Sequence, residues 1–373
     1  MQLASIGFSE EQGELLDIAA NFCRDKSPIA KVRSLIDSEA GYDADVWREM
    51  ADLGWLAIAV PEAHGGVGLS LAEVVPVVEQ MGRNLFASPF VSTTVAMQAL
   101  SAGGTDEQQA HWLPKIAAGS VATLALYEGH GDWDLHNITA VARVEGDRVI
   151  MSGTKHFVLW ADSAEVIVAS VMLDGKPALI VLRTADIPAG ALRREAIIDE
   201  TKRSFAFLLD GISVPKSALL DPAKAQATLS VIDMTASLLQ TAENVGGTQS
   251  VIDYTLSYLT TRKQFGKLIG EYQALKHPIV DAYVDYEKAR SLLYSAAYSI
   301  GDQGLGEIAV RMASASADTA YSFAADRAIQ FHGGFGFTHD CDAGLHRRAA
   351  IFAASQYGDA AWHRAKLGDL LLA

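Results

Sequence analysis

The hydrophobic period of this chain changes twice, and these changes constrain its fold more than any other feature. Apolar residues recur at helical spacing in the first part, short β-branched runs of strand period fill 121–214, and helical spacing returns after Pro215. The sequence therefore predicts an α+β protein that is mainly α. We expect an N-terminal helical domain at 1–118, a middle β domain at 119–218 and a C-terminal helical bundle at 219–373.

The same spacing predicts the individual elements. Ser9 and Gln12 fit a capping box that begins a first helix. Further helices are expected before the β domain, at about 44–54, 70–82, 89–102 and 105–118. Within the β domain, the runs that predict strands are 140–144, 149–151, 164–171, 179–182 and 205–209. The last part has long helical stretches at about 224–261, 272–301, 305–330 and 342–371, and four long helices with short connections predict an antiparallel four-helix bundle.

Composition excludes several classes of protein. Half of the 373 residues are apolar and a fifth are charged, which is typical of a globular chain. The 30 Lys and Arg against 45 Asp and Glu give a net charge of −15, which argues against a nucleic-acid partner. Cys23 and Cys341 are too few for a disulfide framework. An acidic N-terminus, and apolar runs well short of about 18 residues, predict a cytoplasmic protein without a membrane span.

A basic motif lies at the junction of two predicted helices. It is Arg262-Lys263-Gln264-Phe265-Gly266, followed by Gln273 at the start of the next helix. An Arg before a Phe-Gly turn places a guanidinium near a helix N-terminus, where phosphate is favoured. A basic residue before Gly also occurs as an ordinary helix C-cap, so both interpretations stay open.

A glycine-rich motif follows a later helix. It is Gln330-Phe331-His332-Gly333-Gly334-Phe335-Gly336. Three glycines within four residues allow the backbone to approach a ligand closely, as at a pyrophosphate. The alternative is a loop that only ends a helix. His332, His339 and His346 are seven residues apart, which is not the spacing of a facing pair on a helix, so we expect no metal site.

Together and in this order, the two motifs resemble the C-terminal domain of the acyl-CoA dehydrogenase family, where they are R-x-x-F-G-x-x-I-x-x-x-Q and Q-x-H-G-G-x-G. The resemblance extends along the chain. Pro61-Glu62-Ala63-His64-Gly65-Gly66 is similar to the family's V-P-E-x-x-G-G, and Gly153-Thr154-Lys155 to its G-x-K. The family fold implies an N-terminal helical domain, a β-barrel-like middle domain and a C-terminal four-helix bundle, in the order predicted above.

The resemblance implies FAD as the cofactor, held between subunits. All positions that match the family's contacts to the ADP half are retained, namely Arg262, Phe265, Gln273, Gln330, Gly333 and Gly334. The side that faces the isoalloxazine ring differs. Tyr127 stands where the family has a flavin-contacting Thr, and Phe157 keeps a ring on a strand that has lost its Thr donor. Asp359 stands at the Thr of the family's G-T pair and is a further predicted contact.

The family's reaction requires a carboxylate that takes the α proton of an acyl-CoA while a hydride leaves the β carbon. The two family positions for this Glu are occupied here by Tyr357 and by Ala236, which lies 29 residues before Phe265. Asp233 and Glu243, on the same predicted helix as Ala236, are the alternative bases. A solvated or helix-capping role is the other interpretation of both acids.

Several functions remain open at this stage. The retained ADP side and the missing base resemble the shorter, beta-type partner subunit of heteromeric bacterial acyl-CoA dehydrogenases, some of which act on CoA thioesters of steroid side chains. The alternatives are a self-sufficient homo-oligomeric enzyme with a displaced carboxylate, and a base-free flavoprotein or non-catalytic acyl-CoA- or FAD-binding protein of the same fold. The expected partners are an acyl-CoA, a homologous chain in a dimer of dimers and an electron-transferring flavoprotein.

Overall fold

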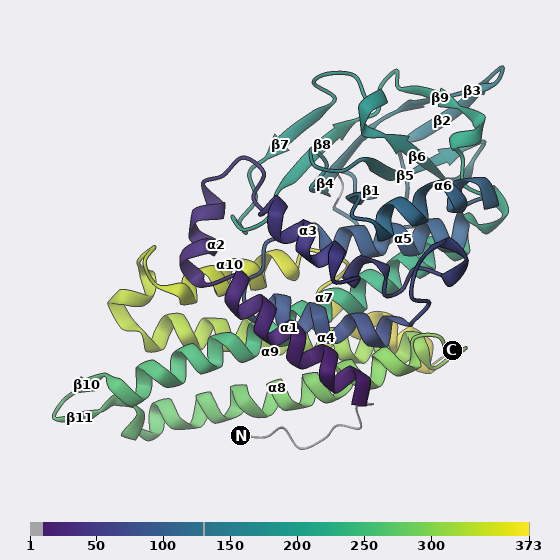
Figure 1. The fold of residues 1–373 in the computed structure, drawn as a ribbon. Helices are drawn as coiled ribbons and strands as arrows, with labels where there is room; N and C mark the ends of the chain where they lie inside the picture. Colours follow the sequence, from purple (N-terminus) through teal and green to yellow (C-terminus); the bar gives the residue numbers. More distant parts are fainter. Residues whose placement is uncertain (1–9, 130, 373) are drawn as a thin grey trace.

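The computed structural model describes residues 10–129 and 131–372. Figure 1 shows the β sheets gathered at one end of the molecule and three long helices at the other. These helices are α7 (Ala225–Thr261), α8 (Gln273–Ser299) and α9 (Gly306–Phe331), and each packs against the other two. The predicted order of a helical part, a β part and a second helical part is confirmed.

The first helical part is built from short helices with local start signals. Within the described residues it comprises α1 (Glu10–Lys26), α2 (Ile29–Ile36), α3 (Ala44–Asp52), α4 (Leu71–Arg83), α5 (Phe90–Gly103) and α6 (Asp106–Ala117). Ser70 and Thr105 begin α4 and α6 with capping boxes. The capping box predicted at Ser9 lies outside the described residues. Helix α2 was not predicted, because its eight residues are too few to establish a helical period.

The middle part holds two sheets. The first contains β1 (Ala122–Ala125), β2 (Val141–Glu145), β3 (Arg148–Ser152), β5 (Val166–Leu173), β6 (Lys176–Arg183) and β9 (Ser213–Pro215). Its order is β1-β5-β2-β3-β9 with β6 also on β5, and β5 runs parallel to β1 and β2. The second sheet has the order β4-β8-β7, from β4 (Thr154–Leu159), β7 (Leu192–Glu195) and β8 (Ser204–Leu208). Strand β4 shifts register between Lys155 and Val158, which places Phe157 on a bulge with a φ of 54°.

The prediction of a single helix over 342–371 is wrong. The structure has two helices there, α10 (Asp342–Ala353) and α11 (Ala360–Leu372). Tyr357 and Gly358 have φ angles of 55° and 104°, which an α-helix does not accommodate. Asp359 then begins α11, since its carboxylate accepts from the amide of Trp362 at 2.8 Å. In the bundle, α10 and α11 together take the place of the expected fourth helix, and both pack against α9.

Helix α7 is the centre of the molecule and packs against α4, α5, α8 and α9. It crosses α4 at two glycines. A Cβ added at Gly82 would lie 2.1 Å from the carbonyl oxygen of Glu243, and one at Gly246 would lie 1.9 Å from that of Glu79. The two backbones touch because neither glycine has a side chain. This contact holds the middle of α7 against the N-terminal helices.

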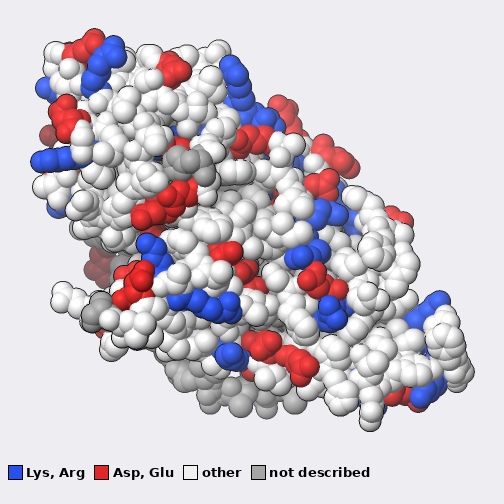
Figure 2. Space-filling model, turned by 180° about the vertical axis from the view of Figure 1, so that it is seen from behind, with Lys and Arg blue, Asp and Glu red and all other residues white. Residues whose placement is uncertain are grey.

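Charged side chains of both signs are interspersed over the face shown in Figure 2. The net charge of −15 is therefore not gathered there into one acidic patch. Within residues 10–129 and 131–372, no helix is long and apolar enough to cross a membrane. We propose domain boundaries at 118/119, just after α6, and at 218/219, just after β9.

Candidate functional site

An open cavity of about 840 Å³ lies where α7 ends. Next to it, β10 (Lys263–Gln264) and β11 (Lys267–Leu268) form a hairpin that projects from the molecule in Figure 1. The 3₁₀ turn Gly333–Phe337, which follows α9, forms the facing side. The lining residues are Tyr258, Arg262, Gln264, Phe265, Ile269, Tyr272, Ala274, Leu275, Phe331, His332, Gly333, Gly334 and Phe335. The basic motif and the glycine motif therefore meet in one cavity.

The residues predicted for the ADP half of FAD fall into two groups. Those that line the cavity are Arg262, Phe265, Gly333 and Gly334. Gln273 and Gln330 are exposed beside it, at the first residue of α8 and near the end of α9. Phe265 is 91% exposed at the tip of the hairpin, and Phe337, the last residue of the glycine turn, is 83% exposed. Such exposure of large apolar rings around one cavity is typical of a surface that a partner covers.

The cavity offers a cation beside open glycine backbone. Arg262 forms no ion pair with any of residues 10–129 and 131–372. Gly333 has a φ of 59°, and a Cβ added at Gly333 or Gly334 would meet no atom within 4 Å. A free guanidinium next to an open backbone turn suits a phosphate group. These residues therefore fit the ADP half of a dinucleotide.

His332 holds the glycine turn against α7. Its ring stacks between Tyr254 and Tyr258, with ring centroids 4.7 and 4.3 Å away. Its Nδ1 donates to the carbonyl of Ala328 at 2.7 Å. Burial lowers the pKa of His332, so the ring is neutral near pH 7. Sequence reasoning missed both tyrosines, because two aromatic residues one helical turn apart are also typical of an ordinary core.

The residues predicted to face the flavin ring lie on the loop after β1, on β4 and on the turn before α11. Tyr127, just after β1, is buried, and its hydroxyl accepts from the amide of Tyr357 at 2.7 Å. The two ring centroids are 5.7 Å apart. Phe157 is 40% exposed on the bulge of β4, and the carboxylate of Asp359 is engaged as the cap of α11. The position next to Tyr127 is thus filled by a side chain of the chain itself.

The first alternative base, Asp233, is held in an ion pair. Ala236, one turn further along α7, is fully buried and apolar. Asp233 Oδ2 lies 2.5 Å from Nη2 of Arg311, whose side chain is 3% exposed and also pairs with Glu307. The guanidinium stacks over the ring of Trp362 at 4.7 Å. Burial raises the pKa of Asp233, and the positive charge of Arg311 opposes this increase. Because Arg311 holds the carboxyl in an ion pair, Asp233 is not a free base.

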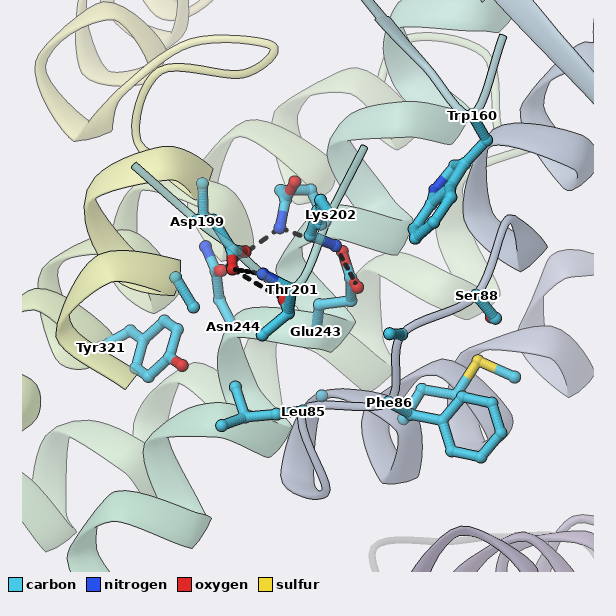
Figure 3. A pocket seen from close by; sticks show the side chains of 16 residues that line it. Leu85, Phe86, Ser88, Trp160, Asp199, Thr201, Lys202, Glu243, Asn244 and Tyr321 are labelled. Carbon is cyan, nitrogen blue, oxygen red and sulfur yellow. Dashed lines mark hydrogen bonds and ion pairs between the residues drawn. The ribbon is translucent and has the colours of Figure 1, made fainter. Parts of the chain in front are cut away.

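The second alternative base, Glu243, is also paired. Figure 3 shows it beside Lys202 in a small cavity between α4, α7 and α9, and its Oε1 lies 2.8 Å from the Nζ of Lys202. Burial alone would lower the pKa of Lys202, but Glu243 and Asp199 outweigh it and the pKa lies above its ordinary value. The cavity holds about 40 Å³, which is room for a few water molecules. An acyl-CoA does not fit there.

The cations that bind these acids carry no signal in the sequence. Lys202 is 41 residues from Glu243, and Arg311 is 78 residues from Asp233. Neither pair has helical or strand spacing, so only the fold brings the partners together. No group of three or more His, Cys, Asp or Glu side chains in the described part of the chain is arranged to hold a metal ion.

Comparison with known proteins identifies both helical parts. Residues 9–120 match the acyl-CoA dehydrogenase N-terminal domain, and residues 235–368 match the acyl-CoA dehydrogenase C-terminal domain. Acyl-CoA dehydrogenase FadE12 of Mycobacterium tuberculosis is 30% identical over 316 residues, which is 80% of each chain. Acyl-CoA dehydrogenase IpdE2 of the same organism is 30% identical over 343 residues, or 91% of each chain.

Solved structures share the whole fold. A variant of the Tcur3481-Tcur3483 steroid ACAD is 29% identical with a TM-score of 0.87, and the match covers 97% of this chain and 98% of that one. The ChsE4-ChsE5 complex from Mycobacterium tuberculosis is 24% identical with a TM-score of 0.90, over 99% of both chains, which shows a common fold. The motifs, the three-part architecture and these relatives agree, and the chain belongs to the acyl-CoA dehydrogenase family.

Proposed function

We propose that this chain is the partner subunit of a heteromeric acyl-CoA dehydrogenase, in which a homologous chain holds the flavin ring and the catalytic carboxylate. The proposal rests on one observation: one half of the family's site is retained in this chain and the other half is not. The cavity suited to a dinucleotide is retained, whereas Tyr357 and Ala236 stand at the positions of the base. The similar structure named Tcur3481-Tcur3483 steroid ACAD carries two chain names, which supports a pairing of this kind.

In such a pair, this chain contacts the ADP half of the FAD that the homologue holds. Arg262 would bind the phosphate oxygens, and the backbone of Gly333 and Gly334 would leave room for them. The exposed ring of Phe265 becomes buried in the contact between the two chains. FAD supplies the acceptor for the hydride that leaves the acyl-CoA. This chain's own role is to bind and orient the cofactor of its neighbour.

The ion pairs disfavour the alternative of a self-sufficient enzyme. Asp233 is held by Arg311 and Glu243 by Lys202. A general base must lie free within hydrogen-bond reach of the proton that it takes. Neither acid can do so without breaking a buried or half-buried ion pair, which costs several kcal/mol.

Co-expression with a homologous chain that carries the family's Glu tests the proposal. We expect the chain alone to purify without flavin, and the pair to be yellow and to reduce an electron acceptor with acyl-CoA. Arg262→Gln should weaken FAD binding to the pair about 10- to 100-fold, because a charge-assisted hydrogen bond to phosphate contributes about 1.5–3 kcal/mol. Lys263→Gln, on the same hairpin but outside the cavity lining, is the matched control and should bind FAD as the unmodified pair does. A chain that binds stoichiometric FAD alone and oxidises acyl-CoA would refute the proposal.

A further inference from the structure

Two aromatic side chains of the middle part reach across to the turn that precedes α11. The Tyr127 hydroxyl accepts from the amide of Tyr357 at 2.7 Å, and their rings are in contact. Six residues further on, the Nε1 of Trp133 donates to the carbonyl of Ser355 at 3.0 Å. The Trp133 ring also lies edge-on to Trp362, with centroids 6.4 Å apart. The loop after β1 is therefore joined to this turn by two hydrogen bonds and two ring contacts.

Tyr127 is fixed in place by the strand behind it. Its carbonyl accepts from the amide of His156 in β4 at 2.9 Å. Lys155, the residue before His156, is fully buried, and its Nζ donates to the carbonyl of Leu126 at 3.2 Å and to Glu128 at 2.6 Å. The residues on both sides of Tyr127 are thus tied to β4. These bonds fix the backbone that carries the ring, and the hydrogen bond to Tyr357 orients the ring, so we call this contact the closure.

The closure leaves no slot for a planar ring between Tyr127 and Tyr357. A ring bound between two surfaces needs them about 7 Å apart, which is twice the distance of a good van der Waals contact. The two tyrosine rings are 5.7 Å apart, tilted by 51°, and contact each other directly. The cavity beside Tyr357 measures about 10 Å³, which is room for one water molecule. These residues do not fit an isoalloxazine ring.

We propose that Tyr127 and Trp133 are the two side chains that exclude a flavin ring from this chain's own middle domain. The inference rests on the proposed pairing with a homologue that holds its own FAD. Two side chains of one loop block the flavin ring, whereas the fold of the surrounding backbone is retained. A small residue at each position should therefore reopen the space between the loop and the turn.

The test is the number of FAD molecules bound per pair of chains, measured from flavin absorbance and protein concentration at saturating FAD. The pair with the unmodified chain should bind one FAD. The pair with Tyr127→Thr and Trp133→Ser should bind a second, so the ratio rises from one to two. Tyr127→Phe is the matched control, because it keeps the ring and removes only the hydrogen bond, and its ratio should stay at one.

Two results would overturn the inference: a ratio of two with the unmodified chain, or a ratio of one with a double variant whose unfolding temperature shows that it is folded. Should the double variant not fold, the single variants Tyr127→Thr and Trp133→Ser are counted separately, and ratios that stay at one in both contradict the assignment. The measurements distinguish failure of this inference from failure of the proposed function. An unmodified pair that binds one FAD but has no dehydrogenase activity contradicts the partner role and not the closure. An unmodified pair that is active and binds two FAD molecules contradicts the closure and not the partner role.

Discussion

Arg203 provides the sharpest test of how the middle part is held to the first helical part. Its side chain is 2% exposed and extends from the start of β8 to the end of α2. It donates to the carbonyls of Leu35, Ile36 and Ser38 at 2.7 to 2.9 Å, and to that of Glu39 at 3.3 Å. These carbonyls lie at and just beyond the C-terminus of α2, where a cation is favoured. We predict that Arg203→Met strongly destabilises the protein.

The magnitude follows from the carbonyls that lose their donor. Each buried acceptor left unsatisfied costs about 1–3 kcal/mol. The carbonyl of Leu35 keeps its hydrogen bonds from Ser38, and water can reach some of the other three after the substitution. A loss of about 3–5 kcal/mol is therefore expected, which is in the range of breaking a buried charged contact. Arg203→Lys keeps the charge but offers three donors in place of five, so its loss should be smaller.

Urea unfolding at fixed protein concentration, followed by tryptophan fluorescence and circular dichroism, measures these losses. Arg193→Met is the matched control, because Arg193 is exposed on β7 and surface substitutions usually change stability by less than about 0.5 kcal/mol. The expected order of stability is Arg193→Met, then Arg203→Lys, then Arg203→Met. A loss below about 1 kcal/mol for Arg203→Met would show that this contact does not hold the middle part to α2.

Three further outcomes are expected. Gly246→Ala should lower the unfolding temperature, because its Cβ would lie 1.9 Å from a backbone oxygen of α4 and overpacking costs about 1–3 kcal/mol or more; an unchanged value would contradict the close helix crossing. Burial alone would raise the pKa of Glu128, but Lys155 and Thr139 outweigh it and hold the pKa at about 2. Lys155→Met should therefore destabilise the fold at pH 7 by about 3–5 kcal/mol in urea unfolding, and a neutral result would deny the importance of this ion pair. Burial lowers the pKa of His346 to about 4, so the unfolded chain binds more protons below pH 6.5 and stability should fall from pH 6.5 to 4; His346→Gln should flatten this part of the urea-midpoint profile, and an equally steep profile would exclude the histidine as its cause.

The two motifs that meet in the cavity at the end of α7 follow local patterns. Arg262 and Phe265 belong to one turn, and Gly333 and Gly334 to another, so each motif fixes its own backbone shape. The cavity forms when α7 and α9 pack side by side, and the helical period already predicts that packing. The break at Tyr357 was not predictable in the same way, because its positive φ belongs to a residue type that rarely adopts it.

Long-range contacts account for what the sequence did not predict. Tyr127 and Tyr357 are 230 residues apart, and Arg203 binds carbonyls about 165 residues away. A hydrogen bond to a backbone carbonyl does not depend on the residue that carries it, so such a contact leaves no pattern in the chain. The absence of a carboxylate at the family positions, Tyr357 and Ala236, could be inferred from the motifs. The contact between the Tyr127 and Tyr357 rings could be found only from the fold.

Titration of the separately purified chain with FAD asks whether the chain binds the cofactor without a neighbour. We predict no change in flavin absorbance or fluorescence at concentrations that saturate the pair formed with a Glu-containing homologue. Adding that homologue should restore binding, and Arg262→Gln should weaken this binding while Lys263→Gln should not. One FAD bound per isolated chain, with the affinity of the pair, would contradict the claim that this chain completes the site of a neighbour.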